Sequence, residues 1–162
     1  MNKLIYHEKL QSNLTTGLFV ILALIFLALF SWRVTSVGWK FTPLLFLFLS
    51  VFFLFYVFNY RTLQIRISDK ELILRFGLVR WKTDLMNIQA CSRDNPPLWI
   101  KYGGAGVHFA LVEGIYRAFF NFLEGPRVLI TFITKQGPVQ ALSFTTYQPD
   151  RILDLLKKRI SA

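Results

Sequence analysis

Two long runs without a single charged side chain constrain this chain more than any other feature. Residues 11–32 and 41–60 contain no Asp, Glu, Lys or Arg and consist mainly of Leu, Phe, Ile, Val and Ala. At about 1.5 Å per helical residue, each run is long enough to cross a hydrocarbon layer of about 30 Å. The second run also lacks the polar face that a core helix of a soluble protein shows. We therefore predict a membrane protein with a transmembrane hairpin over residues 14–60, whose spans cover about 14–32 and 41–60.

The charges around these runs predict the orientation of the hairpin. Six Lys or Arg residues flank the hairpin on its outer sides, and two lie in the loop between the spans. Positive residues near span ends favour the cytoplasmic side, so we expect both termini in the cytoplasm and residues 1–13 as a cytoplasmic N-terminal tail. The expected location is the bacterial inner (plasma) membrane, as a multi-pass protein. The alternative for the first run is a cleaved signal peptide. Residues 34–36 satisfy a loose small-residue rule for cleavage, but residues 30–33, just after the apolar core, do not.

After the second run, the pattern changes from continuous to alternating hydrophobicity. Leu63, Ile65 and Ile67 alternate with polar residues, which is typical of a half-buried strand. Glycine- and proline-containing turns separate further strand-like segments. We expect about seven antiparallel strands in meander order, near residues 63–67, 72–76, 78–82, 87–91, 115–122, 127–134 and 139–145. With an amphipathic helix over 148–160, residues 61–162 are predicted to form a mainly-β domain, either a small barrel or two packed sheets.

Three segments of this domain resemble bacterial PH-like domains: residues 63–68, 71–77 and 82–88. In that family, a hairpin is followed by a glycine and then by an element of the pattern polar-Leu-x-x-Ile. The stretch 102–108 is similar to a glycine motif of some membrane-tethered members, which often carry a bulky aromatic where this chain has Ala105 and an arginine where it has His108. The resemblance implies a PH-like fold attached to one or two membrane spans, and it implies no activity.

The chain is basic, with a net charge of +10. A basic domain beside a bilayer is attracted to anionic lipid by about 1 kcal/mol per well-placed Lys or Arg. We predict lipid-headgroup contacts by Arg61, which follows the second span, and by Lys157, Lys158 and Arg159 at the end of the last helix. Nucleic-acid binding requires basic residues that cluster with exposed aromatics. Here the basic residues are scattered among strands, so no nucleic-acid partner is expected.

Few residues are available for catalysis or metal binding. The chain has two histidines and one cysteine, far apart in sequence, and so we predict no metal site and no cofactor. One alternative is an enzyme acting on a membrane-bound substrate with His108 and Glu113. However, His108 lies in an alternating segment where a packed or surface histidine is more common. The spans themselves contain no ionisable residue, which argues against a proton or ion pathway.

The glycine-rich stretch after Pro96-Pro97 is the best candidate for a surface that faces a partner. About 20 residues there show no clear regular structure, and such long segments are often functional. The predicted partner-binding residues are Trp99, Tyr102, Gly103, Gly104, Gly106 and His108. The alternative is that the glycines mark a bend or bulge where two backbones approach closely.

These features together predict a non-enzymatic, membrane-anchored PH-like module. It would act as a scaffold or assembly factor that binds a protein partner, a second copy of itself or the anionic membrane surface. A small accessory subunit of a membrane transport or secretion complex is the main alternative, and it differs chiefly in the identity of the partner.

Overall fold

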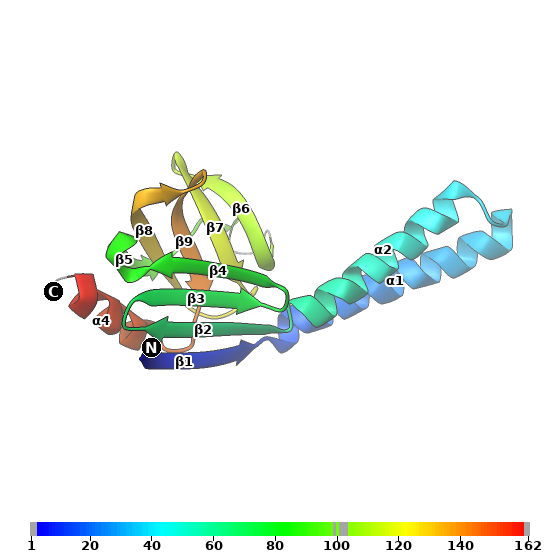
Figure 1. Ribbon diagram of the computed structural model, residues 1–162. Helices are drawn as coiled ribbons and strands as arrows, with labels where there is room; N and C mark the ends of the chain where they lie inside the picture. The colour runs from blue at the N-terminus through cyan, green and yellow to red at the C-terminus, as the bar shows by residue number, and fades with distance from the viewer. Residues whose placement is uncertain (1–2, 99, 101–103, 161–162) are drawn as a thin grey trace.

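The computed structural model describes residues 3–98, 100 and 104–160. Two long helices pack side by side and extend away from a mainly-β domain that has two sheets and a C-terminal helix (Figure 1). The predicted order of helical pair, β domain and C-terminal helix is therefore confirmed. The PH-like fold and the insertion into a membrane stay predictions.

The helical pair consists of α1 (Asn13–Val37) and α2 (Phe41–Asn59). The side chain of Ser12 caps α1 by accepting a hydrogen bond from the Thr15 amide, as Ser often does at a helix start. At the other end, Gly38 has a φ of 71°, a conformation that glycine adopts without steric cost. A tight turn into α2 is thus encoded by one residue.

The two helices contact each other through aromatic rings and one buried hydroxyl. Phe26 stacks on Phe53 with ring centroids 5.6 Å apart, and the Ser50 hydroxyl donates a hydrogen bond of 2.9 Å to the carbonyl of Ala23. Most other apolar side chains of the two helices are uncovered, since only 17% of the most apolar 18-residue segment of α1 and 11% of that of α2 is buried. Both helices are long and apolar enough to cross a membrane, and neither is covered like the core helix of a soluble domain.

The first sheet has four antiparallel strands in the order β1-β2-β3-β4. These are β1 (Leu4–Gln11), β2 (Thr62–Ser68), β3 (Glu71–Phe76) and β4 (Val79–Asp84). The structure differs here from the predicted tail over residues 1–13, because β1 pairs with β2 and buries Tyr6 and Leu10 in the core. Glu8 lies between them on the same face, where its carboxylate accepts a hydrogen bond from Thr146. This polar residue interrupts the alternation that would have indicated a strand.

The second sheet has five strands in the order β5-β8-β9-β7-β6. These are β5 (Ile88–Asp94), β6 (Gly106–Val112), β7 (Ile115–Asn121), β8 (Arg127–Gln136) and β9 (Val139–Thr145). The described residues thus form nine strands rather than seven, and β7 pairs with β9 in parallel, so the predicted antiparallel meander differs from the structure in number and in order. Of the two additional strands, β1 lies in the predicted tail and β6 begins inside the glycine-rich stretch.

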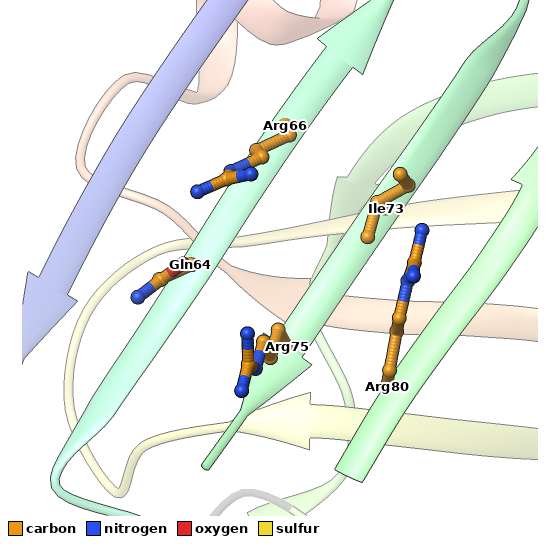
Figure 2. A pocket seen from close by; sticks show the side chains of 5 residues that line it. All are labelled: Gln64, Arg66, Ile73, Arg75 and Arg80. Carbon is orange, nitrogen blue, oxygen red and sulfur yellow. The ribbon is translucent and has the colours of Figure 1, made fainter. Parts of the chain in front are cut away.

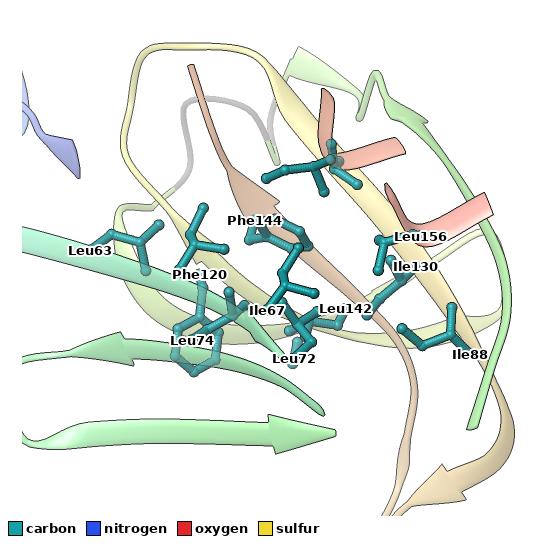
Figure 3. Packing of buried hydrophobic residues seen from close by; sticks show 14 of the residues in the cluster. Leu63, Ile67, Leu72, Leu74, Ile88, Phe120, Ile130, Leu142, Phe144 and Leu156 are labelled. Carbon is teal, nitrogen blue, oxygen red and sulfur yellow. The ribbon is translucent and has the colours of Figure 1, made fainter. Parts of the chain in front are cut away.

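The core lies between the two sheets and is covered at one side by α4 (Pro149–Ile160) (Figure 3). A short 3-10 helix, η1 (Leu85–Asn87), joins β4 to β5. Leu74 comes from the first sheet, Phe144 from the second and Leu156 from α4, and each is almost fully buried. Burying one such side chain stabilises a fold by about 1.5–3 kcal/mol, so the two sheets and α4 form one domain.

The helical pair is attached to this domain at the start of α1. β1 runs directly into α1, and the helix start contacts the loop between β7 and β8 (Figure 1). The Ser12 hydroxyl donates a hydrogen bond of 2.7 Å to the Glu124 carboxylate, and the Thr15 hydroxyl accepts one of 3.1 Å from the Leu123 amide.

A second attachment lies at the end of α2, which continues into β2. The side-chain oxygen of Asn59 accepts a hydrogen bond of 2.9 Å from the Leu78 amide in the β3–β4 turn. The ring of Tyr60 packs edge-on against Phe76, with centroids 5.5 Å apart. Two attachment points fix the orientation of the helices relative to the sheets, which a single flexible linker would not do.

Candidate anion-binding groove

A basic surface covers the outer face of the first sheet, the face opposite the core. Arg66 lies on β2, Arg75 on β3 and Arg80 on β4, and all three are exposed. The strand register places Arg75 between Gln64 and Arg80, and it places Arg66 opposite Ile73 in the neighbouring row. Directly opposite residues in adjacent strands have Cβ atoms about 4.5–5.5 Å apart. The pairing of the strands therefore gathers three arginines that are separate in the sequence.

These five side chains line a hollow of about 110 Å³ (Figure 2). Nε of Arg75 donates a hydrogen bond of 2.9 Å to the Gly77 carbonyl, which orients this guanidinium. The nearby carboxylate of Glu71 is paired with Lys82 at 2.6 Å, and in the described part of the chain none of the three arginines has a carboxylate partner. Like charges directly opposite each other destabilise a sheet, so the positive charge of Arg75 and Arg80 favours an anion in this hollow.

A second hollow, of about 210 Å³, continues the first toward the helices. Its lining residues are Phe58, Asn59, Thr62, Gln64, Arg75 and Gly77. Gln64 and Arg75 line both hollows, so the two hollows adjoin, and we call them together the basic groove. The groove begins at the last turn of α2 and ends beside Arg66.

Sequence reasoning missed the basic groove because its residues are scattered along the chain. Gln64 and Arg66 on one strand, and Arg80 and Lys82 on another, alternate with apolar residues, which indicates that each strand has a polar face. Such alternation does not reveal which strands are neighbours or in which register they pair. Both are needed before the arginines can be placed in adjacent rows.

The predicted partner-binding residues are only partly described by the structure, and Trp99, Tyr102 and Gly103 lie outside the described residues. Gly106 begins β6 with a φ of +91°, and a Cβ there would lie 2.9 Å from Cγ of Tyr60. Glycine is therefore required at this position by backbone conformation and by the attachment of α2. A Cβ on Gly104 would meet the ring of His108 at 3.5 Å, an ordinary contact. Gly106 therefore has a structural reason to be glycine, which is the close approach of its backbone to the ring of Tyr60.

His108 and Glu113 do not form the acid–base pair that the enzyme hypothesis requires. His108 lies in β6, and its ring stacks on that of Phe119 with centroids 4.8 Å apart. Burial is the main cause that lowers the pKa of His108 to about 4, and the charge of Arg127 contributes to it. Glu113 lies in the β6–β7 turn and pairs with Arg117 at 3.1 Å. Glu113 is five residues further along the chain than His108, which corresponds to roughly 16 Å along a strand. The two predicted catalytic side chains are therefore not within reach of one proton.

The residues predicted to contact lipid headgroups are found at two separate places. Arg61 lies between α2 and β2, close to the basic groove. Lys157, Lys158 and Arg159 form the last turn of α4, at the end of the β domain that is remote from the two long helices (Figure 1). If the helices span a membrane, only Arg61 of this set lies near its surface.

Comparison with protein-family models, with curated proteins and with solved structures finds no match to this chain. The resemblance to PH-like domains accordingly stays a prediction.

Within the described residues, no group of three His, Cys, Asp or Glu side chains is placed to hold a metal ion. Cys91 packs against α4 with its sulfur 3.9 Å from the Leu153 carbonyl oxygen, and burial raises the pKa of its thiol.

Proposed function

We propose that the protein is a non-enzymatic, membrane-anchored, PH-like module that uses the basic groove to bind an anionic partner at the membrane surface. The single observation that carries this proposal is the groove itself. Three exposed arginines without carboxylate partners in the described chain surround a depression that starts at the end of an apolar helix. In this account, α1 and α2 span the bacterial inner membrane.

The arrangement of the helix ends supports an orientation with both termini on one side of the membrane. β1 precedes α1 and β2 follows α2, and these two strands are paired along their length. Two spans return the chain to the side from which it started, and one sheet then contains both chain segments. The excess of Lys and Arg outside the inter-helix loop favours the cytoplasm as that side.

The fixed attachment of the helices supports a role in presenting the groove at a defined height. Strands of the first sheet extend away from the helices in nearly the same direction (Figure 1). At about 3.3 Å per residue, the row that contains Gln64 and Arg75 lies roughly 10 Å beyond Arg61. This is about one Debye length at an ionic strength of 0.1 M and exceeds the length of about 8 Å at 0.15 M, so the attraction between this row and anionic headgroups depends on salt.

Titration with a soluble polyanion tests this function. The full-length protein in detergent is titrated with inorganic triphosphate, or with a poly-glutamate peptide, and compared with an Arg75→Gln/Arg80→Gln variant. Charged hydrogen bonds contribute about 1.5–3 kcal/mol each, so losing two is expected to weaken binding by more than tenfold. Lys70→Gln/Lys135→Gln, which removes two exposed charges outside the groove, is the matched control. No binding of either polyanion to the wild-type protein would contradict the proposal.

A further inference from the structure

We propose that the β3–β4 turn is a further membrane contact of this protein, in which Leu78 inserts into the bilayer beside the end of α2. The partner of this turn is the boundary between the acyl chains and the headgroups. The inference rests on one part of the proposed function, the crossing of the membrane by α1 and α2. It does not depend on a ligand in the basic groove.

The composition of this turn differs from that of the other short turns. Four pairs of consecutive strands in the described chain are joined by two residues each. Three of these connections consist of charged residues, glycine and proline, namely Asp69-Lys70, Glu113-Gly114 and Gly137-Pro138. The fourth is Gly77-Leu78, and Leu78 is 80% exposed. Leucine is not among the residues that favour a turn in water, so its presence at this tip calls for another environment.

The β3–β4 turn is fixed to the end of α2. Asn59, the last residue of α2, accepts a hydrogen bond of 2.9 Å from the Leu78 amide through its side-chain oxygen. Gly77 has a φ of +49°, and a Cβ on it would clash with Asn59. Glycine adopts this conformation without steric cost, so the turn packs closely on the helix. Leu78 is therefore held at the level of the helix end.

The length of α2 gives the depth of this level. The 19 residues of α2 extend over about 28 Å, which is close to the thickness of about 30 Å of a hydrocarbon core. If α2 crosses the membrane, Asn59 lies at the boundary of this core, and Leu78 lies there with it. Arg61 is exposed and follows Asn59 by two residues, which places it among the headgroups.

Leu78 also adjoins an apolar surface that a membrane would cover. Single exposed apolar side chains are common on proteins and need no explanation. Here, however, Phe58 in the last turn of α2 is 77% exposed and lines the same hollow as Gly77. The rest of α2 is uncharged and mostly uncovered. The strands of the first sheet run away from the helices, so the β3–β4 turn lies at the end of the sheet nearest to them (Figure 1).

Quenching by brominated lipid measures the depth of Leu78 directly. Single cysteines are introduced into the full-length Cys91→Ala variant, labelled with a nitrobenzoxadiazole fluorophore and reconstituted in nanodiscs of phosphatidylcholine and phosphatidylglycerol. The three cysteine variants are Leu78→Cys, Met86→Cys and Val51→Cys. Met86 is the matched control, because it is also 80% exposed but lies beyond the other end of β4, roughly 20 Å from Leu78. Val51 lies in the middle of α2 and reports whether this helix is in the membrane.

The label at Leu78 is expected to lose most of its fluorescence when the phosphatidylcholine carries bromine near the top of its acyl chains. It should also be protected from iodide in the solvent. The label at Met86 should be quenched by iodide and not by bromine, and the label at Val51 should be quenched by bromine deeper in the chains. Circular dichroism of each labelled variant verifies that the strands are intact.

A substitution measures the contribution of Leu78 without a label. In the same nanodiscs, Leu78→Asp is expected to lower the folding equilibrium constant of the β domain by about tenfold or more, as for the loss of one buried leucine side chain. Leu78→Phe, which keeps the tip apolar, and Met86→Asp, which lies far from the helices, should each change it by about twofold or less. Urea unfolding followed by circular dichroism gives these values, and an equal effect of the two aspartate variants would contradict the inference.

The outcomes separate this inference from the proposed function. Quenching of Val51 together with exposure of Leu78 to iodide overturns the inference alone. Protection of Leu78 from iodide without quenching by bromine means that a second copy of the chain covers the turn, which also overturns it. Equal quenching of Leu78 and Met86 by bromine means that the whole domain lies along the bilayer and that the turn has no special role. If Val51 escapes quenching, the membrane anchor of the proposed function fails, and this inference fails with it.

Discussion

The two sheets of the β domain use their charged residues in opposite ways. On the outer face of the first sheet, Arg66, Arg75 and Arg80 are exposed around the basic groove. On the outer face of the second sheet, Asp94 and Arg117 have side chains that are 3% and 6% exposed and lie 3.6 Å apart.

The buried charges of the second sheet are compensated within the protein. Ser143 donates a hydrogen bond to Asp94, and Arg117 also contacts Glu113 at 3.1 Å. Ile100 packs over this face together with Phe119. A buried charge requires a partner because its desolvation is costly, whereas an exposed charge does not. The charges of the second sheet therefore serve the fold, and those of the first sheet are free to serve a ligand.

The largest expected effect comes from breaking the buried pair. Asp94→Ala leaves the guanidinium of Arg117 without its most buried partner, which should lower the free energy of unfolding by about 3–5 kcal/mol. Glu71→Ala breaks the more exposed pair with Lys82 on the first sheet and should cost about 1 kcal/mol or less. Denaturant unfolding followed by circular dichroism measures both. Equal losses for the two variants would remove the contrast between the sheets.

The next effect concerns the glycine-rich stretch at the start of β6. Gly106→Val introduces a side chain at a φ of +91° and against the ring of Tyr60, which should lower the free energy of unfolding by about 2–3 kcal/mol. Gly104→Ala, whose Cβ makes an ordinary contact, should change it by less than about 1 kcal/mol. The same unfolding assay reports both values. A stable Gly106→Val variant that fails to bind a partner would restore this stretch as a binding surface.

A smaller effect is expected from pH, through His108 on the second sheet. Its pKa is about 4 in the folded protein, below the ordinary value of 6.5. Between these values the unfolded chain binds a proton that the folded chain does not, so stability is complete above pH 6.5 and declines as the pH falls toward 4. The ring is partly exposed, and the loss is on the order of 1–2 kcal/mol. His108→Phe keeps the stacking on Phe119 and should abolish this part of the pH dependence in thermal unfolding scans.

The smallest effect has the opposite sign. Arg75→Gln/Arg80→Gln removes a like-charge pair from the first sheet, and without ligand it should raise the free energy of unfolding by about 0.2–1 kcal/mol. Differential scanning calorimetry at low salt measures the change. A marked loss of stability would mean that these arginines, like those of the second sheet, serve the fold.

Sequence patterns predicted the elements whose signals are local. The two apolar runs correspond to α1 and α2, and alternating residues located β2, β3 and β4 within a few residues. β1 escaped prediction because Glu8 occupies an inward position and is satisfied by Thr146 from the other end of the chain. β6 escaped because it begins inside the glycine-rich stretch and because its apolar side chains Phe109 and Leu111 are 49% and 61% exposed, so the sequence pattern does not match the burial of the strand.

The candidate groove depends on information that one strand does not contain. Arg75 and Arg80 are brought opposite each other by a local hairpin, which the Gly77 turn makes predictable. Arg66 joins them through the β2–β3 register, and Phe58 joins through the way α2 continues into β2. The parallel pairing of β7 with β9 is likewise a long-range choice. These pairings between strands depend on which sheet each strand joins and in what order, and the local sequence pattern does not contain that information.

The most direct test of the contrast between the sheets is a thermal unfolding measurement with and without ligand. Wild-type protein and the Arg75→Gln/Arg80→Gln variant are compared in detergent, in the absence of anions and in the presence of inorganic triphosphate. A ligand that binds only the folded state raises its stability. We expect the variant to be at least as stable as the wild type without ligand, and only the wild type to be stabilised by triphosphate. A variant that is less stable alone, and that gains as much from triphosphate as the wild type, would contradict the account.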